Sequence, residues 1–290
     1  MAPRRLIVNA DDFGAAPEVN EAIERAYRDG ILRSASLMVG APSFGDAVQR
    51  ARRLPGLAVG LHLVLVYGRP VLPPERVPDL VNAHGEFPTD LARAGVRYFF
   101  HPRIRRQLQD EIDAQFARLA ATGLRLDHVN AQCHMHLHPT IFRLTLQVGR
   151  RYGLRAVRIP SEPIAIASRA AGDRLGTRLG YAAVTAPWRA LMRRTAAGVG
   201  VVCNDYAFGV NDAGAMTEAR VARIVEQLPA GSGEIFFHPA TGPFAGADPG
   251  TESYDWTGEL SALLSGRVRD ALDRGGIARI TYGELAAGTA

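Results

Sequence analysis

Residues 6–14, LIVNADDFG, place an apolar run directly before two adjacent carboxylates. An apolar run of this length is typical of a strand that is buried on both faces of a parallel sheet. The next residues, 17–29, repeat apolar side chains at helical spacing, and Gly30 ends that pattern. The chain therefore begins with a strand and a helix, and acidic residues lie at the junction between them.

The same alternation of apolar runs and helical stretches continues to the end of the chain. We expect further strands at residues 34–39, 57–64, 124–131, 156–159, 199–203, 234–237 and 277–280. We expect further helices at residues 44–54, 104–121, 140–152, 217–228 and 260–274. This alternation predicts an α/β protein with parallel strands and outer helices. A barrel-like (β/α) fold, complete or incomplete, is the expected closure, and a doubly wound open sheet is the alternative.

The length of 290 residues and the hydrophobic content of 47% suit a single catalytic domain that spans residues 1–290. Two insertions interrupt the alternation. Residues 66–100 contain several Pro and Gly and show little periodicity, which predicts an irregular segment. Residues 161–198 are rich in Ala and Arg, which predicts a helical segment.

Composition limits the class of protein. The net charge is +5 and all 34 basic residues are Arg, but no known nucleic-acid-binding motif accompanies them, so we expect no nucleic-acid partner. Cys133 and Cys203 form no CxxC pair, which favours a reducing compartment. The N-terminal apolar run is too short for a signal peptide, and no stretch resembles a membrane span. These features predict a cytoplasmic protein.

Polar residues follow several of the expected strands, and in parallel α/β folds that edge of the sheet forms the active site. Asp11 and Asp12 come first. Adjacent carboxylates repel each other, so the pair suggests a bound cation or a shared proton. Neighbouring residues also point in different directions, so one carboxylate can bind a metal while the other faces a water molecule. The alternative is that one Asp caps the following helix.

The richest polar segment lies between residues 127 and 139, where His134, His136 and His138 alternate with apolar residues. In an extended segment, alternate side chains share a face. His128, Asn130, Gln132, His134 and His136 would then line one side. Neutral imidazole is a common ligand for zinc and related ions, so the segment suggests a metal site. A polar surface turn before Pro139 is the alternative.

His62 and His238 each follow a different expected strand, and Arg158 lies in another. A single histidine in an apolar strand is usually a satisfied core residue, but their common edge of the sheet favours a shared site. Carboxylate and imidazole ligands would bind a divalent ion that polarises a carbonyl and activates water. A nearby carboxylate and a histidine could then move the protons. The residue types therefore predict metal-assisted hydrolysis, without fixing the bond that is cut.

Four elements together resemble the YdjC-like (ChbG-type) carbohydrate deacetylases. They are the NADDFG motif of residues 9–14, the GLH of residues 60–62, the His-rich segment, and the FHP of residues 237–239. The resemblance implies a barrel-like fold, a divalent metal and hydrolysis of an N-acetyl group from a sugar. The Asn-Ala of residues 130–131 and the chain length are most similar to the hopanoid-biosynthesis-associated (HpnK-like) branch of this family.

Position by position, the resemblance implies roles for five residues. Asp11 would be the general base on water, and Asp12 would be a metal ligand. His62 would be the second ligand. His238 would be the general acid for the leaving amine. Arg158 would support Asp11 or the oxyanion.

The third ligand departs from the family pattern, because Gln132 stands where the family has a ligand histidine. An amide oxygen suits Mg²⁺ or Ca²⁺ better than Zn²⁺. His134, two residues on, would share its face in an extended segment, so we expect His134 to complete the site. Gln132 and His136 are the alternatives, and the ion is Zn²⁺ or Mg²⁺.

The hopanoid-associated branch implies an N-acetylglucosaminyl group on a polycyclic lipid as the substrate, and chitooligosaccharides are the alternative. Residues 63–67, LVLVY, are expected to build an apolar pocket. Trp188 beside Arg189, Arg193 and Arg194 suggests peripheral contact with anionic lipid at the inner membrane, although an ordinary surface helix would show the same pattern. The sequence predicts no oligomeric state.

Two other functions stay open. A hydrolase of phosphoesters would also use Asp and His, but no glycine-rich phosphate cradle is present. A non-catalytic carbohydrate- or lipid-binding protein on the same scaffold is the other alternative, and Gln132 is the feature that favours it. Asp11, Asp12, His62 and His238 argue against such a loss of activity.

Overall fold

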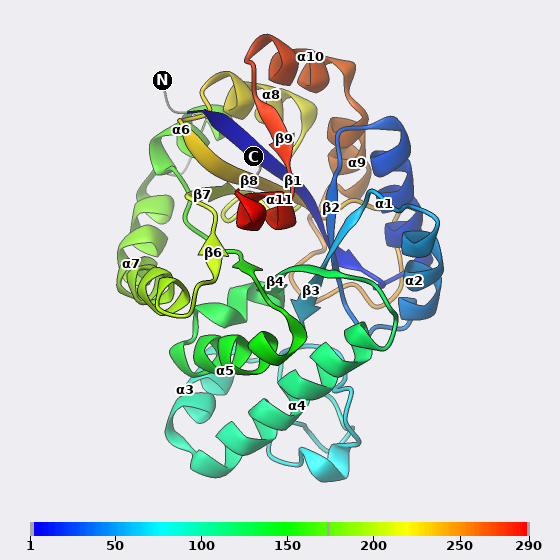
Figure 1. Ribbon diagram of the computed structural model, residues 1–290, viewed down its shortest axis with the longest axis vertical. Helices are drawn as coiled ribbons and strands as arrows, with labels where there is room; N and C mark the ends of the chain where they lie inside the picture. Colours follow the sequence, from blue (N-terminus) through cyan, green and yellow to red (C-terminus); the bar gives the residue numbers. More distant parts are fainter. Residues whose placement is uncertain (1–2, 173–174, 289–290) are drawn as a thin grey trace.

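Every strand pair in the described residues, 3–172 and 175–288, is parallel, and together they build one nine-stranded sheet in this computed structural model (Figure 1). The strands are β1 (Arg4–Phe13), β2 (Ser34–Leu37), β3 (Ala58–Leu63), β4 (Leu126–Ala131), β5 (Ala156–Val157), β6 (Val202–Cys203), β7 (Tyr206–Phe208), β8 (Gly231–Phe237) and β9 (Ala278–Ile280).

Helices surround this sheet (Figure 1). They are α1 (Pro17–Asp29), α2 (Phe44–Arg52), α3 (Leu91–Phe100), α4 (Pro102–Ala120), α5 (Pro139–Gly149), α6 (Ile164–Ala171), α7 (Leu175–Ala197), α8 (Glu218–Glu226), α9 (Trp256–Leu264), α10 (Gly266–Arg274) and α11 (Tyr282–Ala287). Short 3-10 turns occur at η1 (Pro74–Arg76), η2 (Gln132–Leu137) and η3 (Arg150–Tyr152). The sheet and the helices confirm the predicted barrel-like fold and exclude the doubly wound alternative.

Strand β1 lies at the centre of the sheet. It pairs with β8 along Arg4 to Ala10, and on its other side it pairs first with β9 and then with β2. The apolar side chains of Leu6, Ile7 and Val8 are fully or almost fully buried, as expected for a strand that is covered on both faces. This strand therefore carries Asp11 and Asp12 near its carboxyl end, with paired strands on both sides.

The two ends of the sheet come together at Asn204. The strand order is β6-β5-β4-β3-β2-β1-β8-β7, so the outermost strands, β6 and β7, are consecutive in the chain. Asn204 lies between them, and its amide donates to the carbonyls of Ile159 and Tyr206, both at 2.9 Å. Its oxygen accepts the N–H of Ile159 at 2.7 Å. The Ala207 N–H also donates to the Ser161 carbonyl at 2.9 Å. No strand pairing joins β6 and β7 in the described residues, so the barrel is incomplete.

Several element predictions need correction. Residues 66–100 are not wholly irregular, because α3 forms at their end, where the Asp90 side chain caps the helix by accepting the Arg93 N–H at 2.9 Å. The expected helix at 260–274 is two helices, since Ser265 is extended between α9 and α10. Strand β7 and helix α11 were not predicted, because each is short. Strand β1 is longer than predicted and includes both aspartates.

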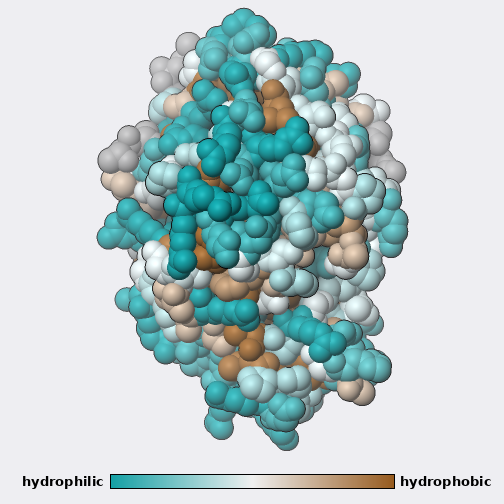
Figure 2. Space-filling view, turned by 90° about the vertical axis from the view of Figure 1, so that its right-hand side faces the viewer, coloured by the Kyte–Doolittle hydropathy of each residue, from teal (hydrophilic) through white to brown (hydrophobic). Residues whose placement is uncertain are grey.

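No helix in the described ranges combines the length and the apolar character needed to cross a bilayer. Cys133 and Cys203 are free thiols. The face over α1 and α2 that Figure 2 turns toward the reader is mostly hydrophilic, with apolar residues in small patches.

The closure through Asn204 makes a first prediction. Asn204→Ala removes three hydrogen bonds to buried backbone groups, so we expect the free energy of unfolding in urea to fall by about 2–4 kcal/mol. Gln227→Ala, which removes an exposed amide bonded to the Arg223 carbonyl, should change it by less than about 0.5 kcal/mol. Equal effects of the two substitutions would show that Asn204 does not close the barrel.

Candidate functional site

Asp11, at the carboxyl end of β1, is held by a buried arginine. Arg158, directly after β5, donates to both Asp11 carboxylate oxygens, at 2.6 and 3.0 Å. The other edge of the guanidinium donates to the Glu234 carboxylate at 2.7 and 2.8 Å, and the Tyr282 hydroxyl donates to Glu234 at 2.6 Å. Asp11, Arg158 and Glu234 are 2% exposed or less. We refer to these three residues as the ion triad.

The ion triad fixes the charge of Asp11. Burial raises the pKa of Asp11, but the Arg158 charge overrides burial and holds this pKa well below its usual range. Burial opposes the charge of Arg158, yet Asp11 and Glu234 raise its pKa above the usual value. Four guanidinium N–H groups are thus engaged by carboxylates. Arg158 therefore positions Asp11, and the oxyanion role that the sequence left open is not favoured.

Two asparagines also donate hydrogen bonds to Asp11. Asn9 and Asn130 each donate to one Asp11 oxygen at 2.9 Å, and both also donate to the Ser36 hydroxyl, at 3.0 and 2.9 Å. The Ser36 hydroxyl lies 3.1 Å from His128 Nε2. The interior of the barrel around Asp11 is therefore a hydrogen-bonded polar network, which fixes this carboxylate before any substrate arrives.

Asp12 points elsewhere because the backbone turns at this residue. Its φ is +64°, a left-handed value that few non-glycine residues adopt, and the pairing of β1 with β2 shifts register between Ala10 and Phe13. The turn brings Asp12 Oδ1 to 3.4 Å from His62 Nε2. Burial and the nearby carboxylates of Asp248 and Asp11 hold the pKa of Asp12 well above its usual range. A cation bound beside Asp12 would favour the ionised form of this carboxyl.

His62 is oriented for ligation by its second nitrogen. Its Nδ1 donates to Asn130 Oδ1 at 2.6 Å, which assigns the proton to Nδ1 because the Asn130 amide nitrogen already donates to Asp11 and Ser36. Nε2 then presents a lone pair on the side of Asp12. A hydrogen bond from the opposite nitrogen is the usual support of a metal-binding histidine. Asp12 and His62 thus meet as the sequence predicts for two ligands.

The His-rich segment does not stay extended, and that prediction is wrong. Strand β4 ends at Ala131, and Cys133 and His134 both take left-handed backbone angles, with φ of 49° and 52°. The alternation therefore breaks at this turn, and the His134 ring packs edge-on against Phe236, with ring centroids 5.5 Å apart. In the part of the chain that the structure describes, no three residues of the types His, Cys, Asp and Glu converge as a metal site. The ligand role of His134 stays a prediction.

Gln132 is the residue of the turn that faces Asp12. Its side-chain nitrogen donates to the Asp248 carboxylate, and its Oε1 is buried without a hydrogen-bond partner. His136 Nε2 instead bonds the Arg158 carbonyl at 3.0 Å, and burial lowers the His136 pKa to about 3, so this ring is neutral. His136 is therefore tied to the backbone beneath the site.

His238 lies after β8. Its ring packs edge-on against Phe236 and Tyr254, with ring centroids 5.9 and 5.5 Å apart. Its backbone N–H donates to the buried Glu259 carboxylate, and its Nδ1 is buried without a partner. Burial lowers the pKa of His238 to about 4 and raises the pKa of Glu259 to about 7.

A cavity of about 260 Å³ opens above Asp12. Its lining includes the polar side chains of Gln132 and Asp248 and the aromatic rings of Phe244 and Trp256, which lie 5.0 Å apart. The volume lies near the lower limit of small-molecule sites. Of residues 63–67, only Val64 reaches this cavity, so the predicted apolar pocket from that stretch is not formed.

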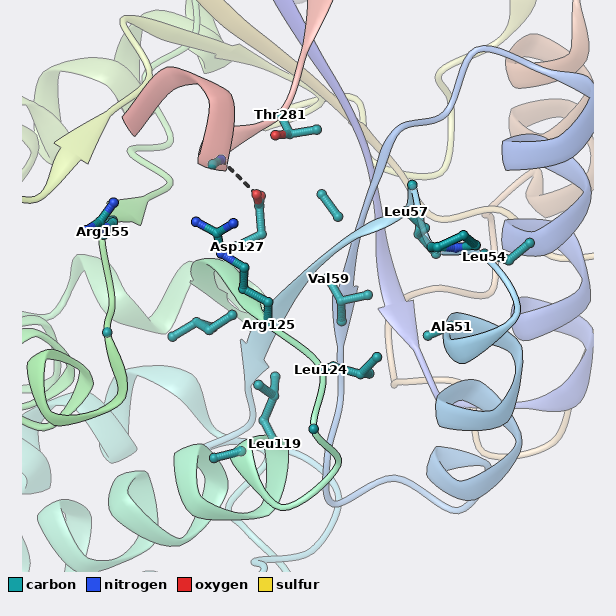
Figure 3. A pocket seen from close by; sticks show the side chains of 18 of the residues that line it. Ala51, Leu54, Leu57, Val59, Leu119, Leu124, Arg125, Asp127, Arg155 and Thr281 are labelled. Carbon is teal, nitrogen blue, oxygen red and sulfur yellow. Dashed lines mark hydrogen bonds between the residues drawn. The ribbon is translucent and has the colours of Figure 1, made fainter. Parts of the chain in front are cut away.

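A second cavity, of about 960 Å³, lies at the opposite end of the strands (Figure 3). It is lined by Leu57 and Val59 near the start of β3 and by Arg125 and Asp127 near the start of β4. Asp127 accepts the Gly283 N–H at 2.7 Å there, which ties helix α11 to β4. None of the predicted site residues lines this cavity.

The fold and the site together define an incomplete parallel (β/α) barrel with an Asp- and His-rich centre at the carboxyl ends of its strands. The family model described as YdjC-like protein matches residues 5–274, so the chain belongs to the YdjC-like family. This finding confirms the family resemblance seen in the sequence. The hopanoid-associated branch is a finer assignment that the match does not address.

Known relatives and one crystal structure extend the comparison. Two "Carbohydrate deacetylase" proteins, from Geobacillus stearothermophilus and Brevibacillus brevis, are each 39% identical, over 163 and 148 residues, or 56% and 51% of this chain. The matches span 60% and 56% of those relatives, which is less than two thirds of their length. A crystal structure of a candidate cellobiose-phosphate cleavage protein from Enterococcus faecalis V583 superimposes with a TM-score of 0.74. It covers 98% of this chain and 99% of its own at 24% identity, which supports the fold alone.

Sequence reasoning missed Glu234, Asn9 and Asp248 as site residues. Glu234 is the one acidic residue of its apolar strand, and Arg158 is the one basic residue of another. Two opposite charges in two buried strands of one sheet are a signal that could have predicted their pairing. Asp248 lies in a loop, and nothing in the sequence marks it.

The ion triad makes a second prediction. Arg158→Met leaves two buried carboxylates without a counter-ion, so we expect the free energy of unfolding to fall by about 3–5 kcal/mol at neutral pH. Arg194→Met, at an exposed arginine, should change it by less than about 0.5 kcal/mol. Urea unfolding followed by circular dichroism measures both. A loss no larger than that of the exposed control would contradict the ion triad.

Glu259 makes a third prediction, which concerns pH. Its pKa is raised from 4.5 to about 7 by burial, so the folded protein binds the Glu259 proton more tightly than the unfolded chain does. The stability from this group is therefore full below about pH 4.5 and is lost as pH rises through 7. Relative to Glu259→Gln, the wild type should lose about 2–3 kcal/mol between these limits. Parallel pH profiles of the two proteins would contradict the raised pKa.

Proposed function

We propose that this chain is a metal-dependent hydrolase that removes the acetyl group from an N-acetylated sugar. The carbohydrate deacetylase relatives support the reaction, and the YdjC-like family supports the scaffold. One observation in the site supports the mechanism most directly. The two adjacent carboxylates are separated, because Asp11 is held by Arg158 while Asp12 lies 3.4 Å from His62 Nε2.

A divalent cation fits the residues on the Asp12 side. Asp12 and His62 offer an oxygen and a nitrogen on one side, and the buried Oε1 of Gln132 has no other partner. The buried Nδ1 of His134 has no hydrogen-bond partner either, so His134 and Gln132 are both candidates for the third ligand. An amide oxygen at this position would favour Mg²⁺, and an imidazole nitrogen would favour Zn²⁺. A bound divalent ion would supply Lewis-acid polarisation of the acetyl carbonyl and a more acidic water.

The remaining residues would transfer protons, or would hold the proton-transferring groups in position. Asp11 stays ionised in its setting of Arg158, Asn9 and Asn130, and it is the group that would accept a proton from the attacking water. His238 is neutral near pH 7, because burial lowers its pKa to about 4. It could therefore protonate the leaving amine only after receiving a proton, and the proton that Asp11 takes from the attacking water is the one available for that transfer. Arg158 keeps Asp11 in place and takes no proton.

The cavity suits a single sugar unit. Phe244 and Trp256 would pack against the apolar face of the ring, and Asp248 and Gln132 would face its hydroxyls. We propose N-acetylglucosaminyl on a polycyclic lipid as the finer substrate, with chitooligosaccharide as the alternative. The support for a lipid aglycone is the exposed apolar surface described below, since residues 63–67 form no pocket for it.

The proposed reaction makes a fourth prediction. Acetate release from an N-acetylglucosaminyl lipid should require added divalent metal and stop with chelator. Asp11→Asn should lower kcat by about 10²–10⁴-fold, because the proton acceptor is lost. Asp113→Asn, which removes a carboxylate paired with Arg151 on the surface, should leave kcat unchanged.

Other outcomes separate the alternatives. Acetate from diacetylchitobiose alone would keep the chemistry and exclude the lipid aglycone. Metal-independent acetate release, or full activity of Asp11→Asn, would contradict the mechanism. A protein that binds the sugar and releases no acetate would favour the non-catalytic alternative, with Gln132→His as the variant to examine next.

A further inference from the structure

The large apolar side chains that are exposed in the described residues all lie on two helices, α3 and α7. No other helix, strand or loop in the described ranges exposes a large apolar side chain. We refer to the outward surfaces of these two helices as the α3–α7 face. Their exposed large apolar side chains are Leu91, Val96, Phe99, Leu175, Leu179, Val184 and Trp188, of which Val184 is the most exposed at 72%.

Helix α7 turns a charge-free surface outward between Leu175 and Ala190. Its only charged residues in that stretch are Arg178 and Arg189. Arg178 is buried and pairs with Asp212 at 2.6 Å. Arg189 donates to Thr185 Oγ1 at 2.7 Å and so folds back onto its own helix. The outward surface of this stretch is therefore apolar over about four turns of helix.

Helix α5 packs between α3 and α7, so the two apolar helices flank it on one side of the molecule (Figure 1). None of these three helices contains an Asp or a Glu. Arg93, Arg143 and Arg194, one from each helix, are exposed. This side thus combines apolar and cationic side chains, in contrast to the mostly hydrophilic side shown in Figure 2.

We propose that the α3–α7 face docks on a bilayer that contains anionic phospholipid. Exposed Leu, Val, Phe and Trp side chains beside arginines are the composition of helices that lie in the membrane interface. The exposed Asp90 caps α3 beside this face, but helices α3, α5 and α7 themselves carry arginines and no acidic residue, which matches an anionic lipid surface in charge. Two copies of the chain packed through this face would instead bring these arginines together.

The structure changes which arginines are available to contact anionic lipid. The sequence suggested Arg189, Arg193 and Arg194, but Arg193 donates to the backbone carbonyls of Asn204 and Asp205, at 2.8 and 2.6 Å. Arg189 is bonded within α7. Arg194 is exposed and can contact lipid, and so can the exposed Arg93 on α3 and Arg143 on α5.

The docked face adjoins the candidate site. Phe99 packs edge-on against His138, with ring centroids 5.9 Å apart, and α7 packs against the turn η2 that holds Gln132 and His134. If the proposed function holds, docking would bring the site to a sugar that is anchored in the same bilayer. The docking itself does not depend on that function.

Vesicle flotation in low salt tests the docking, and it requires no substrate. The wild type should float with vesicles of phosphatidylcholine and phosphatidylglycerol, and should stay behind with phosphatidylcholine alone. Leu179→Glu with Val184→Glu should abolish flotation. Arg93→Glu with Arg143→Glu should weaken binding about fivefold or more for each arginine changed. The matched control, Arg25→Glu with Arg274→Glu, makes the same charge change on α1 and α10 and should weaken binding less.

Trp188 gives a second readout in the folded protein. The Trp256→Phe variant leaves Trp188 as the single tryptophan, and its emission should shift to shorter wavelength on anionic vesicles. Three results would overturn the proposal. They are no flotation of the wild type on anionic vesicles, equal weakening by the face and control arginine variants, or a dimer in ultracentrifugation that Leu179→Glu with Val184→Glu converts to a monomer. Vesicle binding without acetate release would keep the docking and contradict only the proposed reaction.

Discussion

The buried guanidinium of Arg158 between Asp11 and Glu234 is the interaction on which the rest of the site depends. It joins β5, β1 and β8 across the barrel interior, and its hydrogen bonds to both carboxylates are 2.6–3.0 Å long. A buried charge needs well-placed counter-charges to be stable, and two carboxylates around one guanidinium leave the ion triad with one net negative charge. This arrangement keeps Asp11 ionised and fixed in position, although its side chain is almost wholly excluded from water.

Asp12 has different contacts and a different pKa from Asp11 because the backbone adopts a left-handed angle at Asp12. The left-handed angle at Asp12 turns its side chain toward His62, whereas the guanidinium of Arg158 is hydrogen-bonded to Asp11. Strain of this kind at a non-glycine residue is common at functional sites. Two chemically identical carboxylates thus receive opposite pKa shifts, one lowered by Arg158 and one raised by burial and like charge. Acid–base and ligand roles follow from this separation.

The sequence predicted the strand and helix alternation well, because buried parallel strands show as apolar runs and outer helices as periodic stretches. It also placed Asp12 and His62 at one edge, where the structure brings them together. It could not predict the turn at Cys133 and His134, since neither residue is a glycine that would mark a left-handed angle. Short elements such as β7, which has three residues, are too short to show a repeating pattern of apolar side chains. Glu234 was missed because one polar residue does not change the pattern of an apolar strand.

Metal content after equilibrium dialysis tests the separation of the two carboxylates most directly. The account predicts that Asp11→Asn retains a divalent ion at near wild-type stoichiometry, while Asp12→Asn and His62→Ala lose it. Mass-spectrometric metal analysis of the folded variants, checked by circular dichroism, would measure this. An ion retained in Asp12→Asn and lost in Asp11→Asn would contradict the account, because it would place the cation on the carboxylate that Arg158 holds.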